Sequence, residues 1–140
     1  MNHRIAILSD IHGDTTALEA VIGDARAQGA TEYWLLGDIL LPGPGREDLF
    51  ELLDAIPITA AVRGNWDDCV LEALDGEYGL EDPQEIQLLR LTQYLMEGLD
   101  PKRIDWLRSL PLVEKKEVNG IRFSLTHNLP EKNYGGDLRP

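Results

Sequence analysis

Three short apolar runs of this chain each lead to an acidic or amide side chain, at nearly constant spacing. The runs and the polar residues after them are 5–8 with Asp10, 33–36 with Asp38, and 58–62 with Asn65. The polar residues lie 28 and 27 residues apart, about the length of one strand, one helix and their turns. Because an open parallel sheet gathers its functional groups at the carboxyl ends of its strands, we expect these side chains to converge. The pattern predicts an α/β fold.

The first of these runs ends in two residues that can bind the same cation. Asp10 and His12 stand two positions apart, and alternation along an extended chain places such residues on one side. Gly13 follows and allows the backbone to turn sharply. The sequence therefore predicts a pair of metal ligands at the end of a strand.

Helical periodicity fills the segments between and after the apolar runs. Either Asp14 or a capping box of Thr16 and Glu19 begins the first helix. Proline and glycine in the stretch 39–45 predict a loop. The predicted helices are 14–27, 46–54, 66–74, 84–97 and 100–110.

A β-hairpin is predicted near the end of the chain. Residues 112–118 and 121–125 flank Asn119-Gly120, a strong signal for a two-residue hairpin turn. The second of these strands leads to His127, so a metal-ligating residue type again follows a strand. The stretch 130–140 carries little apolar material and is expected to form a loop.

Length and composition limit the class of protein. A chain of 140 residues predicts one domain, residues 1–140, with a helical insert at about 76–108. Cys69 is the single cysteine, which excludes a disulfide framework within the chain and a thiolate metal cluster. The net charge of −12 disfavours binding to nucleic acid or anionic membranes. The sequence contains neither a membrane-length apolar run nor a signal peptide, so we expect a cytoplasmic protein.

The donor set favours particular metals and one kind of chemistry. Carboxylate, amide and imidazole groups without thiolates favour Mn²⁺, with Fe, Zn²⁺ or Ni²⁺ as alternatives. Asp38 is central in the series and is the natural ligand to bridge two cations. Two cations about 3.5–4 Å apart suit hydrolysis at phosphorus, because they activate a water and hold the attacking and leaving oxygens in line.

Each candidate ligand also has a purely structural interpretation. Asp10 or Asp38 could cap a helix, Asn65 could belong to a turn, and His127 could be a partly buried histidine. Four such coincidences at one edge of a sheet are less probable than one site.

The motifs, taken together and in order, are similar to those of a known family. They are Ser9-Asp10-Ile11-His12-Gly13, Leu36-Gly37-Asp38, Arg63-Gly64-Asn65-Trp66-Asp67 and Thr126-His127. Over residues 4 to about 128 the chain resembles the calcineurin-like metallophosphoesterase superfamily, and in particular its small prokaryotic phosphodiesterase-like branch. The resemblance implies a four-layer αββα sandwich with a dinuclear metal site.

The resemblance also implies a role for each candidate residue. Asp10 and His12 would bind the first metal, Asp38 would bridge, and Asn65 and His127 would bind the second. The activity implied is hydrolysis of phosphodiesters or nucleotide-type phosphates, including dinucleoside polyphosphates, by a hydroxide that bridges the metals. The expected partner is a small phosphate ester or nucleotide.

The third motif departs from the family pattern at Trp66, where the family usually carries a histidine thought to protonate the leaving group. Indole cannot act as an acid near neutral pH. We expect Asp38, Asn65 and Asp67, which matches the family aspartate, to be the catalytic residues. The alternative for Asp67, and for Asp68 beside it, is that they support the site or begin a helix. Trp66 is either a packing residue or a flat wall that stacks on a base or an aromatic leaving group.

The second departure is the missing Gly-His-x-His segment, which in the family supplies one more ligand to each metal. The remaining histidine, His3, stands at the start of a strand, away from the expected site. We therefore expect the chain to be the N-terminal portion of a metallophosphoesterase domain, and the alternative is a shortened protein with a weakened site. Half a sandwich leaves an apolar sheet face uncovered, which a homo-oligomer could bury. The alternative function is a catalytically impaired scaffold or partner-binding module.

Overall fold

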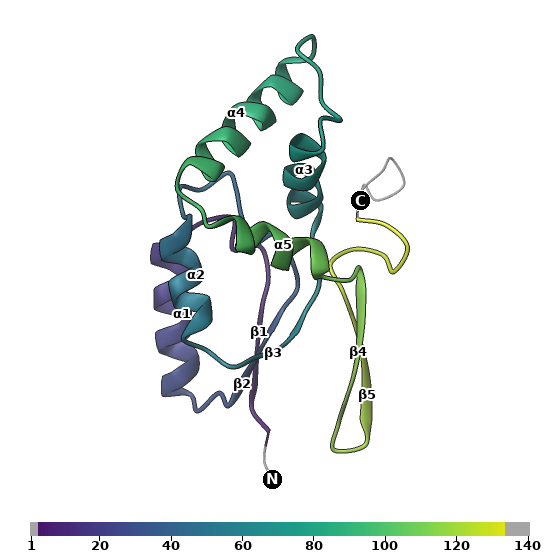
Figure 1. The fold of residues 1–140 in the computed structure, drawn as a ribbon. Helices are drawn as coiled ribbons and strands as arrows, with labels where there is room; N and C mark the ends of the chain where they lie inside the picture. The colour runs from purple at the N-terminus through teal and green to yellow at the C-terminus, as the bar shows by residue number, and fades with distance from the viewer. Residues whose placement is uncertain (1–2, 134–140) are drawn as a thin grey trace.

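The computed structural model describes residues 3–133, in which three strands are each followed by a helix, and two further helices lead to a final hairpin (Figure 1). This arrangement confirms the α/β class, and each predicted helix and strand is present. The elements are β1 (Ile5–Leu8), α1 (Thr15–Ala27), β2 (Glu32–Leu35), α2 (Glu47–Asp54), β3 (Ile58–Ala61), α3 (Asn65–Leu74), α4 (Pro83–Glu97), α5 (Pro101–Ser109), β4 (Val113–Val118) and β5 (Ile121–Thr126).

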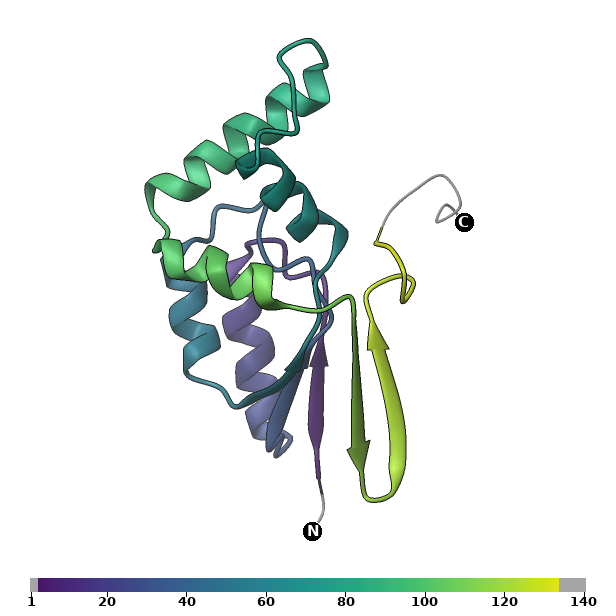
Figure 2. The ribbon, with the colours of Figure 1, turned by 45° about the vertical axis from the view of Figure 1, so that its right-hand side comes forward.

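Strands β1, β2 and β3 form a parallel sheet in chain order. Leu8 pairs with Leu35, and Leu35 pairs with Ala61, so the three strands end side by side. Their carboxyl ends all face upward in Figure 2, toward α3 and α4. The topology therefore brings the polar residues after the three strands to one edge of the sheet.

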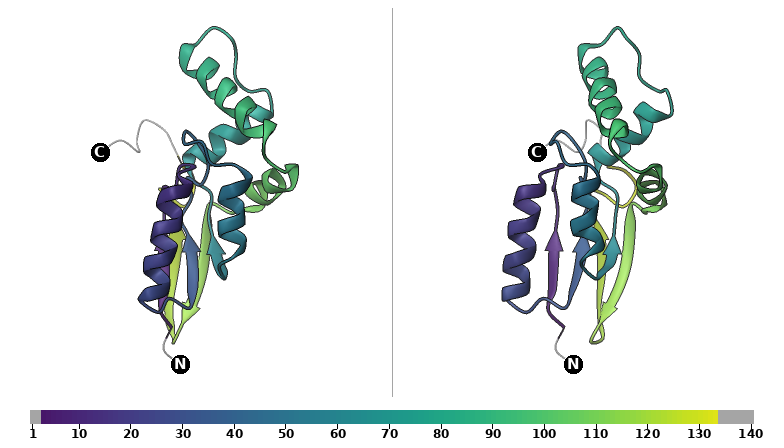
Figure 3. Two further views of the ribbon diagram at one scale, coloured as in Figure 1. Left: turned by 90° about the vertical axis from the view of Figure 1, so that its left-hand side faces the viewer. Right: turned by 60° about the vertical axis from the view of Figure 1, so that its left-hand side comes forward.

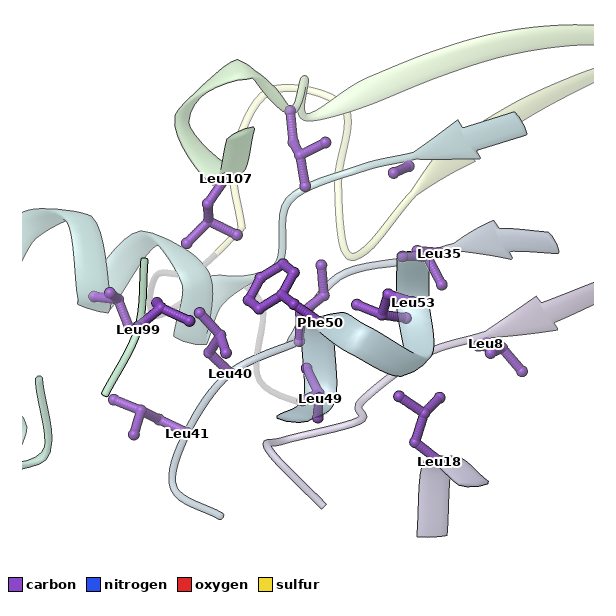
Figure 4. Packing of buried hydrophobic residues seen from close by; sticks show 14 of the residues in the cluster. Leu8, Leu18, Leu35, Leu40, Leu41, Leu49, Phe50, Leu53, Leu99 and Leu107 are labelled. Carbon is purple, nitrogen blue, oxygen red and sulfur yellow. The ribbon is translucent and has the colours of Figure 1, made fainter. Parts of the chain in front are cut away.

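The face of the sheet that meets the helices carries the main hydrophobic core. Leu8, Tyr33 and Leu35 point to this side and are buried against α1 and α2 (Figures 3 and 4). Alternation along β2 explains the choice, because Tyr33 and Leu35 lie two positions apart. Leu18 on α1 and Leu49 on α2 complete the contact.

The opposite face of the sheet packs against the hairpin of β4 and β5. Trp34 and Val62 are buried there with Leu125, and the Trp34 ring meets Phe123 with centroids 5.3 Å apart. Residues 3–133 thus supply a helical layer, a sheet and a hairpin layer. A second helical layer, which a four-layer sandwich has, is not among these residues.

Side chains of β4 satisfy the outer edge of β3 where a further strand would lie. Glu114 accepts the Ala61 N–H at 2.9 Å, and the Lys116 ammonium donates to the Thr59 carbonyl at 2.7 Å. An unpaired strand edge presents free N–H and C=O groups that can pair with another chain. The two bonds satisfy one N–H and one C=O of β3 and fix the hairpin on the sheet.

Helices α3 and α4 lie beyond the carboxyl ends of the strands and contact each other (Figure 1). Arg103 on α5 pairs with Glu47 and Asp54 of α2, both at 2.7 Å. The segment 76–108, expected to be a helical insert, contains α4 and most of α5. No helix of the described part of the chain combines the length and apolar character that a bilayer crossing needs.

Replacement of Trp34 by alanine should strongly destabilise the chain. Trp34 is 1% exposed and joins the sheet to the hairpin, and truncation of a buried tryptophan costs about 3–5 kcal/mol. Urea unfolding of Trp34→Ala and the parent measures this difference in the free energy of unfolding. Ile121, which is 61% exposed on the same hairpin, provides the control, since Ile121→Ala should change stability by less than about 0.5 kcal/mol. Equal losses in both variants would contradict the packing described here.

Candidate metal centre

The loops that follow β1 and β2 are joined by backbone hydrogen bonds. The His12 N–H donates to the Asp38 carbonyl, and the Gly13 N–H donates to the Ile39 carbonyl, both at 2.9 Å. Leu40 and Leu41, which follow Ile39, are fully buried in the main core. The proline- and glycine-rich loop is therefore anchored rather than free, and it holds the turn that carries His12.

Asp67 fastens the loop after β2 to the loop after β3. Its carboxylate is fully buried and accepts the backbone N–H groups of Asp38 at 2.8 Å, Ile39 at 3.0 Å and Gly64 at 2.9 Å. Burial raises the pKa of Asp67 to about 6, although the three N–H groups favour the ionised form. A catalytic role for Asp67 stays a prediction, and its buried, hydrogen-bonded carboxylate favours the alternative that Asp67 supports the site.

Three of the candidate ligands occupy the left-handed region of backbone conformation. The φ angles are 57° at Asp10, 52° at His12 and 54° at Asp38. Side chains other than glycine adopt this region at a cost, and such residues concentrate at functional sites. The backbone here is shaped by where these side chains must point.

Asp10 does not cap α1. Asp14 is the cap, since its carboxylate accepts the Ala17 N–H at 2.9 Å. The Asp10 carboxylate is instead 55% exposed and receives a 2.5 Å hydrogen bond from the Ser9 hydroxyl. One structural interpretation of Asp10 is thereby excluded, and its second oxygen is left facing His12.

His12 turns its Nε2 atom toward two carboxylates. Its Nδ1 donates to the Leu41 carbonyl at 2.8 Å, which leaves Nε2 unprotonated in the neutral ring because a carbonyl only accepts. Nε2 lies 3.5 Å from Asp10 Oδ1 and 3.6 Å from Asp38 Oδ2. The donor atoms of these three residues lie within 4.8 Å of one another, an arrangement that could hold a divalent metal ion.

His127 forms a second group of donors on the other side of Asp38. Its Nδ1 donates to the Leu36 carbonyl at 2.6 Å, and Nε2 lies 2.9 Å from Asn65 Oδ1 and 3.3 Å from Asp38 Oδ2. The hydrogen bond to Asp38 raises the pKa of His127 to about 9. A proton on Nε2 of His127 would therefore compete with a cation for this nitrogen.

Asp38 lies between the two histidines. Its Oδ2 faces both Nε2 atoms, while Oδ1 accepts the Trp66 N–H at 2.8 Å. Within residues 3–133, the ion pairs of Asp10 and Asp38 are with histidine only, without lysine or arginine. This acidic cluster would repel a phosphate unless cations were bound, so the donor set fits metal-dependent phosphate chemistry.

The structure places the other motif residues around the cluster. The Trp66 ring packs against His12 at an interplanar angle of 83°, with centroids 5.8 Å apart. Arg63 pairs with Asp68 and donates to the Leu110 carbonyl at 2.9 Å, so its side chain has a structural role. His3 bonds Glu32 near the opposite end of the sheet. A cavity of about 540 Å³ opens beside Asp10 and His12.

Close backbone contacts at Gly37 and Gly64 were not anticipated from the sequence. A Cβ atom on Gly37 would lie 2.4 Å from the Gly64 nitrogen, and one on Gly64 would lie 2.2 Å from Asp38 Oδ1. The available signal was that a glycine stands directly before both Asp38 and Asn65. These glycines let the two loops approach closely enough for Asp38 and Asn65 to share one site.

The edge of the parallel sheet thus gathers carboxylate, amide and imidazole donors, the ligand types of a divalent metal site. The chain belongs to the calcineurin-like phosphoesterase family, whose family model matches residues 3–138. The recognition made from the motifs is thus confirmed, and so is the α/β fold that it implied.

Individual relatives agree with the family. The uncharacterized protein MJ0912 of Methanocaldococcus jannaschii is 30% identical over 131 residues, which are 91% of this chain and 50% of that protein. A metallophosphoesterase from Sphaerobacter thermophilus is 32% identical with a TM-score of 0.59, over 81% of this chain and 44% of that one. The hypothetical protein PH1004 of Pyrococcus horikoshii is 21% identical with a TM-score of 0.71, over 94% and 57%, and shows the fold alone. The chain thus spans about half the length of its curated relative.

Gly64→Ala should displace the Asp38 carboxylate. The added methyl group overlaps Asp38 Oδ1, so we expect Mn²⁺ binding to weaken at least about tenfold and stability to fall by roughly 1–3 kcal/mol. Isothermal titration and urea unfolding measure the two effects. Gly23 of α1 has open space around it, so Gly23→Ala should leave metal binding unchanged and add up to about 1 kcal/mol of stability. Unchanged Mn²⁺ affinity in Gly64→Ala would refute this account.

Metal binding should release a proton from His127. The pKa of His127 is raised to about 9, and a metal can bind Nε2 only when that nitrogen has lost its proton. The affinity of the protein for Mn²⁺ should therefore rise about tenfold per pH unit between pH 7 and pH 9 and then level off. Titrations with Mn²⁺ in buffers of different ionisation enthalpy count the protons released. The His127→Asn variant should lack this proton release, and release that persists in that variant would assign it to another group.

Proposed function

We propose that the chain contributes the principal metal-binding half of a phosphoesterase that hydrolyses phosphodiesters or nucleotide-type phosphates. The observation that carries the proposal is the position of Asp38 Oδ2, which faces His12 Nε2 at 3.6 Å and His127 Nε2 at 3.3 Å. One carboxylate oxygen shared by two sets of donors is the arrangement that a pair of cations requires.

Two groups of residues would hold the cations. Asp10 and His12 form one group with Asp38, and Asn65 and His127 form the other with the same carboxylate. Oxygen and imidazole donors without a thiolate support Mn²⁺ as the metal, with Fe, Zn²⁺ or Ni²⁺ as alternatives. Bound cations would supply the positive charge that polarises the phosphate and lowers the pKa of the attacking water.

The protein's own residues set the geometry of this site. The Leu41 and Leu36 carbonyls fix which nitrogen of His12 and of His127 faces the cluster. The Trp66 N–H fixes Asp38 Oδ1 and leaves Oδ2 to face both imidazoles. Pre-oriented ligands reduce the reorganisation that accompanies binding and reaction.

Protonation of the leaving group is the step for which the described residues offer no obvious acid. Trp66 stands in the motif position where the family usually carries histidine, and its indole cannot donate a proton as an acid. Asp67 is buried with its oxygens engaged. We therefore expect esters with good leaving groups, such as p-nitrophenolate, to be the better substrates.

Hydrolysis of bis-p-nitrophenyl phosphate with added Mn²⁺ tests the function. Asp38→Ala removes the shared ligand and should lower kcat/KM by a hundredfold or more, as an order-of-magnitude expectation for loss of a metal ligand. Metal content measured on the same samples should fall in parallel. Asp24→Ala, which alters an exposed carboxylate of α1, is the matched control and should keep full activity.

The assay also tests the alternative of a non-catalytic scaffold. A scaffold would show neither stoichiometric metal nor turnover that depends on Asp38. Metal bound without turnover would leave a metal-binding module and exclude the enzyme proposed for this chain.

A further inference from the structure

A groove between α3 and α4 lies next to the candidate metal centre. Its volume is about 280 Å³, at the lower end of the roughly 300–1,000 Å³ typical of ligand sites, so it suits a single planar group. α3 and α4 lie side by side above the sheet edge in Figures 1 and 2. The lining residues are Trp66, Cys69, Gln84, Gln87, Leu88 and Leu91.

Trp66 lines this groove and also lies next to the candidate metal ligands. Its ring lines the groove and also packs edge-to-face on His12, with centroids 5.8 Å apart. Its backbone N–H binds Asp38 Oδ1 at 2.8 Å. A group seated in the groove would thus contact the same indole ring that packs on the ligand His12.

The α4 side of the groove carries two glutamines, both exposed to solvent. Gln84 and Gln87 lie three positions apart on α4 and line the same groove. Within residues 3–133, neither side-chain amide has a hydrogen-bond partner. Each amide carries one acceptor group and two donors, so the pair can form hydrogen bonds with the polar edge of a heterocycle. Leu88 and Leu91 complete an apolar floor.

We propose that this groove binds the base of a nucleoside phosphoester, with Trp66 stacking on the ring and the two glutamines contacting its edge. The proposal rests on the proposed phosphoesterase function and names the class of ester that the site would select. An anionic group does not suit the groove, because its lining carries no lysine or arginine. An aliphatic chain would cover the two amides without satisfying them.

Two phosphodiesters with the same leaving group test the proposal. Adenosine 5′-(p-nitrophenyl phosphate) and methyl p-nitrophenyl phosphate both release p-nitrophenolate, so the ratio of their kcat/KM values reports on the base alone. The unmodified chain with Mn²⁺ should prefer the nucleoside ester at least about tenfold, the scale of one stacked base.

Variants of the groove should remove this preference. The double variant Gln84→Leu/Gln87→Leu and the variant Trp66→Leu should each bring the ratio close to one. The ratio is the readout because loss of Trp66 could also slow both esters through His12. Gln93 is exposed on α4 and does not line the groove, so Gln93→Leu is the matched control and should keep the preference.

A binding measurement separates failure of the subsite from failure of the enzyme. Adenosine added to the metal-free, ¹⁵N-labelled chain should shift the side-chain amide resonances of Gln84 and Gln87. Shifts without hydrolysis of either ester would support the subsite and refute the phosphoesterase function. Hydrolysis with equal kcat/KM values and no shifts would refute the subsite alone. Shifts caused by inorganic phosphate and not by adenosine would also overturn the proposal.

Discussion

The buried carboxylate of Asp67 is the interaction on which the candidate site depends. It accepts N–H groups from the loop after β2 and from the loop after β3, and these are the loops that carry Asp38 and Asn65. A buried acid is costly unless hydrogen bonds satisfy it, and three backbone donors do so here. The same bonds satisfy N–H groups that a sharp turn at the end of a strand would otherwise leave unpaired. Together with the Trp66 N–H bond to Asp38 Oδ1, these bonds fix the relation between the polar side chains at the ends of two parallel strands.

Burial of hydrophobic side chains beneath the site offsets the cost of its unfavourable backbone conformations. Left-handed backbone at Asp10, His12 and Asp38 is unfavourable, and close approach of three acidic or imidazole groups is unfavourable without a cation. Burial of Ile39 and of the two leucines after it holds the loop in place by hydrophobic contact. The site is therefore shaped by the packing beneath it, with the Asp38 and His127 side chains buried and the Asp10 carboxylate exposed at its surface.

The two faces of the sheet are covered to different extents. The helical face is buried along its length, whereas the hairpin reaches Trp34 and leaves Ile7 of β1 54% exposed. Ile7 lies on the same face as Ile5, which packs on the hairpin cluster. The apolar alternation of β1 thus extends beyond the cover that residues 3–133 provide, as expected for half of a two-sheet architecture.

The sequence alone determined the fold class, the element order and the set of polar residues at the sheet edge. These depend on local periodicity and on strand ends, and a short window of residues records both. Only the tertiary structure decided which nitrogen of each histidine faces the cluster, because His127 is oriented by the Leu36 carbonyl, 91 residues away. It also decided that the Asp67 carboxylate joins two loops by hydrogen bonds, and that the Trp66 ring contacts His12 and lines a groove with α4. Such contacts arise from packing between distant segments, for which local pattern carries no signal.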